Sequence, residues 1–298
     1  MVVDDLYMVT PIKTLTLVPP KAPNLLIAPV DYTQTYQDQF SNALRLYFNE
    51  LDNYFRSISS ATGGSYVQFP YGAFHYDKST ALTGNITNVS TTPIPVTSTT
   101  GYSSSGAILV GSEIITYTAI TSTTFAGTIT RGAYATSNVA HTSGAIITSV
   151  QGTTAATATP IYLNTVDFSN GVTIDTGSLT SKITFQYPGI YNIQFSAQLA
   201  NASSSVIDNV TIWFRQNGID LPETAGISTV PSSHGGVDGA IISAWNLFTT
   251  VNTGDYIELY WTTDSGNSVL KTYPVGTSPT HPVSPAVIVT AQFVSAKY

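Results

Sequence analysis

The fold is decided by residues 189–198, which read GIYNIQFSAQ. Apolar side chains at Tyr191, Ile193 and Phe195 alternate with polar ones, the period of two that is typical of a strand with one buried face. Similar runs recur after it at the spacing of a β-sandwich. We expect strands at residues 183–187, 189–198, 209–216, 240–249, 255–261 and 287–294, with turns at Asn217-Gly218 and Thr253-Gly254.

Composition favours strands and a surface of hydroxyls and amides. The chain has 298 residues and 42% hydrophobic content, enough for packed cores in two or three domains. Only 9% of the residues are charged, against about 25% in an ordinary soluble domain. Tyr and Phe, 18 and 12 in number, accompany many Thr, Val and Ile, the residue types that suit a pleated surface.

Charge and cysteine usage argue against several classes of function. The formal net charge is -7 and no basic stripe occurs, so we expect no nucleic-acid partner. No run of 18 apolar residues occurs, so we expect no membrane insertion. The start, Met1 to Asp5, lacks the basic and apolar regions of a secretory signal, which favours a protein that is not exported; a signal removed beforehand is the alternative. Without Cys, neither disulfides nor a thiolate metal site is available.

Residues 1–30 are predicted to form an extended docking arm. They contain five prolines, which remove backbone donors and favour extended conformations before them. Such an arm becomes ordered when it lies across another protein, and the apolar residues Leu25, Leu26 and Ile27 are its expected anchor. The alternative is an ordinary unstructured terminus.

Residues 31–60 have a helical period, and Asp31, Thr33 or Thr35 can serve as the N-cap. We expect this helix to bundle in a homotrimer, although its apolar face could instead pack on the chain's own β core. The seam covers fewer than three heptads, so it should clamp a trimer that is held together elsewhere. Its residues, spaced alternately four and three apart, are Phe40, Leu44, Tyr47, Leu51, Tyr54 and Ile58, widened by Phe48 and Phe55.

Residues 61–84 are predicted to be a linker, and residues 85–152 a small Thr-rich β module with strands at 107–110, 114–118 and 145–147. Four segments of the module are distinctive: Ile94-Pro95-Val96, Glu113-Ile114-Ile115-Thr116-Tyr117, Thr130-Arg131-Gly132-Ala133 and Ala140-His141. They resemble a module that recurs in phage tail and fibre proteins.

Residues 153–298 contain four further segments, FQYPGIY at 185–191, IWFRQNG at 212–218, TGDYIEL at 253–259 and VIVTAQF at 287–293. In this order they resemble the globular head of complement and the wider tumour-necrosis-factor-like jelly rolls. The resemblance implies a jelly-roll β-sandwich whose last strand lies at the centre of a sheet. It also implies a tight homotrimer, which the helix seam predicts separately.

The N-terminal residues carry a third resemblance. Residues 22–32, APNLLIAPVDY, and residues 39–48, QFSNALRLYF, resemble the start of structural proteins from phages of marine and aquatic bacteria. This implies an N-terminal end that docks on a capsid or tail protein and a C-terminal head that projects outward.

Histidine and serine offer no recognisable catalytic or metal site. The four histidines, His75, His141, His234 and His281, are expected in loops, without metal-site spacing or a neighbouring carboxylate cluster. Serine is abundant, but no G-x-S-x-G motif occurs.

Paired carboxylates need separate attention, because a glycan-cleaving spike requires only two. Asp255 and Glu258, three apart in an expected strand, should face opposite sides, and Asp220 and Glu223 flank a proline in a turn. We therefore expect no enzymatic activity, no cofactor and no bound metal.

The sequence predicts a mainly all-β, trimeric structural protein on the exterior of a tailed-phage virion, as a fibre, a spike or a head decoration. Its arm would dock on the particle, and its jelly-roll head would decorate the shell or attach to a host surface glycan or envelope protein. The alternatives are a secreted bacterial adhesion module of the same fold and a glycan-depolymerising tail spike.

Overall fold

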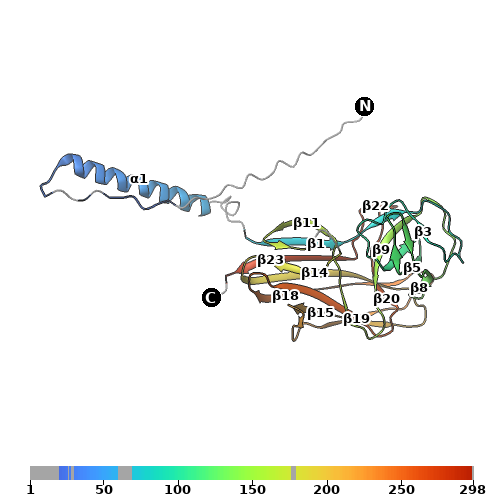
Figure 1. Ribbon diagram of the computed structural model, residues 1–298. Helices are drawn as coiled ribbons and strands as arrows, with labels where there is room; N and C mark the ends of the chain where they lie inside the picture. The colour runs from blue at the N-terminus through green and yellow to red at the C-terminus, as the bar shows by residue number, and fades with distance from the viewer. Residues whose placement is uncertain (1–19, 26, 28–29, 60–68, 176–178, 297–298) are drawn as a thin grey trace, which may run out of the picture. The chain divides into compact units, whose positions relative to one another are not determined.

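The computed structural model describes residues 20–25, 27, 30–59, 69–175 and 179–296. The chain divides into two compact units, residues 1–69 and residues 70–298. Within the described residues, the first unit contains the one helix, α1 (Gln34–Ser59), and the second contains every strand. The protein is therefore mainly all-β, as its composition predicts (Figure 1).

Helix α1 begins at a threonine cap. Of the three expected N-cap residues, Thr33 fills the position, because its Oγ1 accepts a hydrogen bond from the backbone N–H of Tyr36 at 3.4 Å. No Gly or Pro interrupts the sequence from here to Gly63. In the last turn Arg56 pairs with Asp52 at 2.6 Å, where a cation also suits the negative end of the helix dipole.

The strands of the second unit pair antiparallel within four sheets. The largest sheet has the order β11-β1-β23-β14-β20-β9-β4-β5-β8, with β18 on β14 and β2 on β9. The second has the order β12-β13-β19-β15-β16, with β10 on β19 and β17 on β15, and β3-β7-β6 and β21-β22 are two small sheets. The bounds are β1 (Tyr71–Tyr76), β2 (Ser79–Ala81), β3 (Ile94–Pro95), β4 (Gly106–Val110), β5 (Glu113–Tyr117), β6 (Ala119–Ile120), β7 (Thr124–Ala126), β8 (Thr130–Ala133), β9 (Ile146–Gly152), β10 (Thr159–Pro160), β11 (Thr165–Asn170), β12 (Val172–Thr173), β13 (Ile183–Phe185), β14 (Gly189–Asn201), β15 (Asp208–Gln216), β16 (Ile219–Asp220), β17 (Gly226–Val230), β18 (Gly239–Val251), β19 (Tyr256–Thr263), β20 (Ser268–Lys271), β21 (Gly276–Thr277), β22 (Thr280–His281) and β23 (Val287–Ser295).

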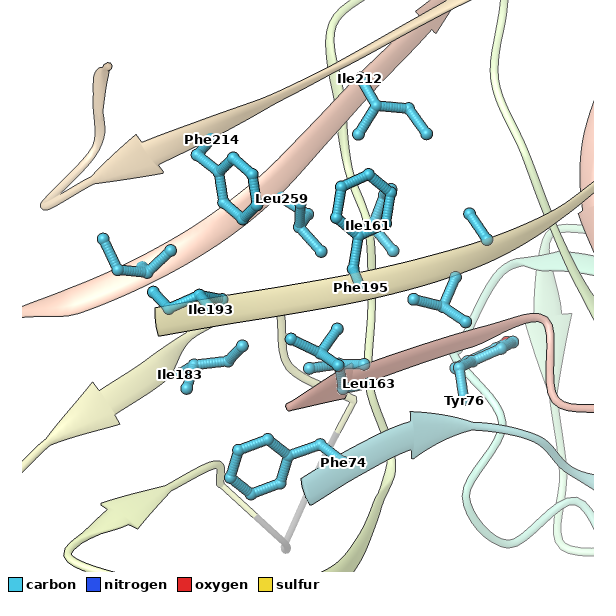
Figure 2. Close-up of a cluster of buried hydrophobic side chains, with 14 of the residues drawn as sticks. Phe74, Tyr76, Ile161, Leu163, Ile183, Ile193, Phe195, Ile212, Phe214 and Leu259 are labelled. Atoms are coloured by element: carbon cyan, nitrogen blue, oxygen red, sulfur yellow. The ribbon is translucent and has the colours of Figure 1, made fainter. Parts of the chain in front are cut away.

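The two larger sheets bury a common core between them. Strand β14 alternates as predicted, so that Ile193 and Phe195 are buried, and Figure 2 shows them facing Phe214 and Leu259 of the second sheet. Rings pack edge-on within this core, with the centroids of Phe195 and Phe214 5.7 Å apart. Burial of large apolar side chains from both sheets is the main stabilising contribution to this sandwich.

Both turns predicted from the sequence are also present. Asn217 and Gly218 have φ angles of 52° and 80° and join β15 to β16, the left-handed pair that a tight two-residue hairpin requires. Gly254, in the other predicted turn, has a φ of 84°.

The segment predicted as a linker, residues 61–84, supplies β1 and β2. Strand β1 lies between β11 and β23 in the large sheet, and its Phe74 and Tyr76 enter the sandwich core (Figure 2). The first strand of the sandwich therefore precedes the Thr-rich module in the sequence.

The Thr-rich module is continuous with the sandwich, although residues 85–152 and 153–298 were expected as separate domains. Its strand β9 pairs with β20, and β4 and β5 extend the same sheet (Figure 1). One face of this extension covers the module's own core, which includes Ile108 and Phe125. The other face packs Leu109 and Val150 against Ala200 and Val269 of β14 and β20. Both faces are buried, which explains the uninterrupted apolar run of β4.

Candidate functional site

The predicted helix seam lies on one side of α1. Its residues Phe40, Leu44, Tyr47, Leu51 and Tyr54 are half-buried, and the side chain of Ile58 lies outside the described ones. Three further apolar side chains of the same helix are more than half exposed, namely Leu46, Phe48 and Phe55. Large exposed aromatics on a helix mark a surface that other chains can cover.

The predicted docking residues of the arm are described in part. The side chains of Leu25 and Ile27 are exposed, and Leu26 lies outside the described residues. Most of the predicted arm, residues 1–19, also lies outside them.

A second candidate assembly surface, which we call the uncharged face, covers the outer side of β14, β18 and β23. None of these three strands contains Asp, Glu, Lys or Arg. Because inward and outward residues alternate, the outer side of β14 carries Asn192, Gln194, Ser196 and Gln198. A sheet face this long without a charged group is unusual for a surface that meets water.

Apolar side chains on the neighbouring strands border the polar row of β14. Phe248 is 58% exposed opposite Asn192, and Ile242 is 63% exposed opposite Gln198. Between them lies the small Ala244, opposite Ser196, whose neighbour on the other side is Ile288. The uncharged face is thus a mixture of apolar and neutral polar groups with a small residue at its centre. This face was not predicted from the sequence, although the absence of charged residues in these strands is a signal that could have indicated it.

The module contains a buried ionic network around Glu113. The carboxylate is fully buried and accepts hydrogen bonds from Arg131 Nε and Nη2, both at 2.7 Å, and from His141 Nε2 at 2.8 Å. The backbone N–H groups of Gly132 and Val139 donate to it as well. Burial alone would raise the pKa of the Glu113 carboxyl, but these hydrogen bonds together hold it below its usual value. The arrangement neutralises its charges internally and fixes the loop that follows β8.

A second histidine also contacts carboxylates. His75 lies in β1, and its Nε2 and Nδ1 are 3.2 Å and 3.1 Å from carboxylate oxygens of Asp77 and Asp167. The hydrogen bond to Asp77 contributes most to raising the pKa of His75, and Asp167 adds to it, although partial burial opposes both. The expectation of loop positions is therefore wrong for His75, and also for His281, which lies in β22.

Three of the four carboxylates considered for glycan cleavage hold local structure, and the fourth, Glu223, is exposed. Asp220 accepts hydrogen bonds from Trp213 Nε1 and from Arg215. Asp255 precedes β19 and binds the side chain of Asn217 across the turns, at 2.8 Å. Glu258 is buried and accepts a hydrogen bond from the hydroxyl of Ser181 at 2.5 Å.

Among the residues that the structure describes, no group of three or more His, Asp or Glu side chains has an arrangement that could hold a metal ion. None of the described helical segments is long and apolar enough to cross a membrane. No protein-family model matches the chain, and the search of curated proteins found no similar sequence.

Proposed function

We propose that this chain is a trimeric structural protein of a tailed-phage virion, with its N-terminal arm docked on the particle and its C-terminal head exposed for host attachment or shell decoration. The observation that carries the assembly part is the uncharged face. It presents Ile242, Phe248 and Ile288 without a charged side chain on β14, β18 or β23. When another copy covers such a surface, apolar area is removed from water and no unpaired charge is buried.

The strand order supports a jelly-roll head of the tumour-necrosis-factor-like kind. Strands β13, β14, β15, β18 and β19 alternate between the two large sheets, with the short β16 and β17 staying beside β15. Strand β23 lies between β1 and β14, at the central position that the resemblance implies for the closing strand. Jelly rolls pass repeatedly between two packed antiparallel sheets in this way.

Trimer formation agrees with two features of the chain in different units. The uncharged face belongs to residues 70–298, and the seam of α1, with Phe48 and Phe55 exposed beside it, belongs to residues 1–69. In a cyclic trimer, one heterologous contact is repeated three times and the ring closes. The heads can therefore form a trimer if the uncharged face of each copy packs against one other surface of the next copy. The helices of three copies would then meet along the seam.

The virion assignment rests on the module and the arm. The motif residues Glu113, Arg131 and His141, which carry the resemblance to phage tail and fibre proteins, form one buried network. These contacts explain why the three residues occur together in the motif, and this supports the resemblance. A hydroxyl-rich surface with few charged residues also suits a particle exterior.

Two measurements test this proposal. Sedimentation equilibrium of the full chain should give three times the monomer mass, and a monomer would contradict the assembly. Phage particles are purified from a culture infected with a phage whose genome encodes the chain. Mass spectrometry should detect the chain in these particles at a fixed ratio to the capsid protein. Its absence from the particles, with the chain present in the lysate, would overturn the virion assignment.

A further inference from the structure

A pocket of about 230 Å³ lies where the module meets the sandwich, and we call it the junction pocket. Strands β4, β5 and β9 of the module and β10 and β19 of the sandwich contribute to its walls. Ligand sites favour such junctions between packed parts of a protein. The volume is below the about 300 to 1,000 Å³ of pockets that take drug-sized molecules, so the junction pocket suits one small ring.

The walls of the junction pocket are polar but uncharged. Tyrosine, serine, threonine and glutamine side chains line it, together with Trp261, and no Asp, Glu, Lys, Arg or His does. Burial raises the pKa of Tyr134 and of Tyr162, so both hydroxyls stay neutral. A phosphate, a carboxylate or an ammonium group would therefore lose its hydration without gaining a counter-charge. Charged ligands are disfavoured on this ground.

Some of these polar groups are already committed to the fold. The side-chain amide of Gln151 both donates to and accepts from the backbone of Tyr162, at 2.9 Å and 2.8 Å. The hydroxyl of Tyr117 donates to the backbone carbonyl of Ser103 at 3.1 Å. These bonds hold the walls in place, so that the pocket exists before any ligand arrives.

Other polar groups retain hydrogen-bonding capacity. Within the described residues, the hydroxyls of Tyr134, Tyr162 and Ser105 make no hydrogen bond to protein. Hydroxyls can both donate and accept hydrogen bonds. A ligand with several neutral hydroxyls matches such a set.

Tyr134 is held over the pocket in a conformation that tyrosine rarely adopts. Its φ angle is 53° and that of Ala135 is 62°. The ring lies directly on Gly152, where an added Cβ would be 2.0 Å from the hydroxyl oxygen. Glycine is required here for close approach of the ring, and strained backbone of this kind gathers at ligand sites.

We propose that the junction pocket binds a single neutral sugar residue, with the Tyr134 hydroxyl as a specific hydrogen-bonding partner. The sugar's hydroxyls meet the uncommitted hydroxyls of the wall, and its apolar ring face meets the aromatic side chains. This inference rests on the proposed host-attachment role and names the class of target, a neutral glycan.

The test uses the full chain and saturation-transfer NMR with methyl glycosides of glucose, galactose, mannose, rhamnose and N-acetylglucosamine. Glucuronate and glucose 6-phosphate serve as charged counterparts. Titration then gives the dissociation constant for the wild type and for Tyr134→Phe, which removes one hydroxyl and keeps the ring. The control variant is Tyr102→Phe, because Tyr102 is also buried with an unpartnered hydroxyl but lies in the module core.

At least one neutral glycoside should bind, and Tyr134→Phe should weaken its binding about tenfold, the effect of one lost hydrogen bond. Tyr102→Phe should bind as the wild type does. Three outcomes overturn the inference: no glycoside of the panel binds, Tyr134→Phe binds unchanged, or a charged counterpart binds as tightly as its neutral parent. Oligomeric mass and presence in particles are measured separately, so a head without sugar binding leaves the virion proposal standing.

Discussion

Glu113 accepts five hydrogen bonds and is fully buried, so it is the residue whose loss should cost the module most. Glu113→Gln keeps the size of the side chain but leaves the guanidinium of Arg131, only 5% exposed, without its counter-charge. Breaking a buried pair in this way costs about 3 to 5 kcal/mol. We expect a loss of this size in the free energy of unfolding measured with urea. The same change at the exposed Glu223 should have almost no effect, and equal losses would contradict the role of the network.

His75 should make stability depend on pH in the neutral range. Both ring nitrogens contact carboxylates, which suits the doubly protonated ring, because a neutral imidazole can donate from one nitrogen only. The pKa of His75 is raised above the ordinary value of 6.5. Its contribution is therefore complete below about pH 6.5 and is lost as pH rises through the raised pKa.

The experiment compares wild type with His75→Gln from about pH 6 to about pH 9, a range that begins below the ordinary histidine pKa of about 6.5 and extends well above it. The difference in unfolding free energy should be largest at the acid end and shrink towards the alkaline end. Asp167→Asn, which removes one of the two carboxylates, should reduce that pH dependence. A difference that is constant over the range would refute the assignment.

Both histidine clusters were invisible as clusters in the sequence. Asp167 lies 92 residues from His75, and strand pairing between β1 and β11 brings the two together. Glu113, Arg131 and His141 were noted as motif residues, but the motif says nothing of contacts. Residue spacing in the sequence can predict a site that lies on a single helix or strand, whereas each of these clusters is formed by residues from several elements.

At the scale of elements, the seam of α1 offers a direct test. Leu51→Glu would place a charge at the centre of the seam, while Asn49→Glu places the same charge on the opposite, solvent-facing side. We expect Leu51→Glu to open the helical clamp and leave the head trimeric. Trypsin should then cut at Arg45 and Arg56, both exposed in α1, about tenfold faster than in wild type.

Sedimentation of the same samples should still give three chains, since the seam is too short to hold a trimer alone. Asn49→Glu should be cut at the wild-type rate. Equal protection of both variants would mean that the seam makes no contact between chains.

Sequence periodicity predicts strands well where one face is buried and poorly where both are. Strand β14 alternates from Gly189 to Leu199, and its predicted start at Gly189 is correct. Strand β1, with only Tyr71 exposed, has no such alternation, and it lies within residues 61–84, which the sequence predicts to be a linker. Its partner strands are β11 and β23, which lie far along the chain, so no local signal marks it.

At the scale of the whole molecule, the sequence could not reveal that module and sandwich share one sheet. Strand β9 (residues 146–152) pairs with β20 (residues 268–271), although the two strands are separated by more than 100 residues of sequence. The Thr/Ala-rich composition of residues 152–159 is typical of a joint between domains, but such a composition also occurs in surface turns. The junction pocket is a direct consequence of this continuity, because its walls come from both parts.

The uncharged face provides the decisive test of the assembly. Ala244 is exposed at its centre, opposite Ser196 and one strand from Ile288, so Ala244→Arg would bring a long cation into the proposed contact. An unpaired charge buried at an interface costs several kcal/mol, which corresponds to a weakening of about a hundredfold or more. We expect this variant to sediment as a folded monomer at concentrations where the wild type is trimeric.

Val89→Arg is the matched control, because Val89 is a highly exposed apolar residue in a turn of the module, outside the uncharged face. It should remain trimeric, and both variants should keep the circular dichroism of the wild type. If Ala244→Arg also stays trimeric with an unchanged dissociation constant, the three strands do not form the contact. If Val89→Arg dissociates as well, added charge rather than position is responsible. The contact is assigned to β14, β18 and β23 only if Ala244→Arg loses the trimer and Val89→Arg keeps it. In that case the loss depends on the position of the charge on the sheet as well as on the charge itself.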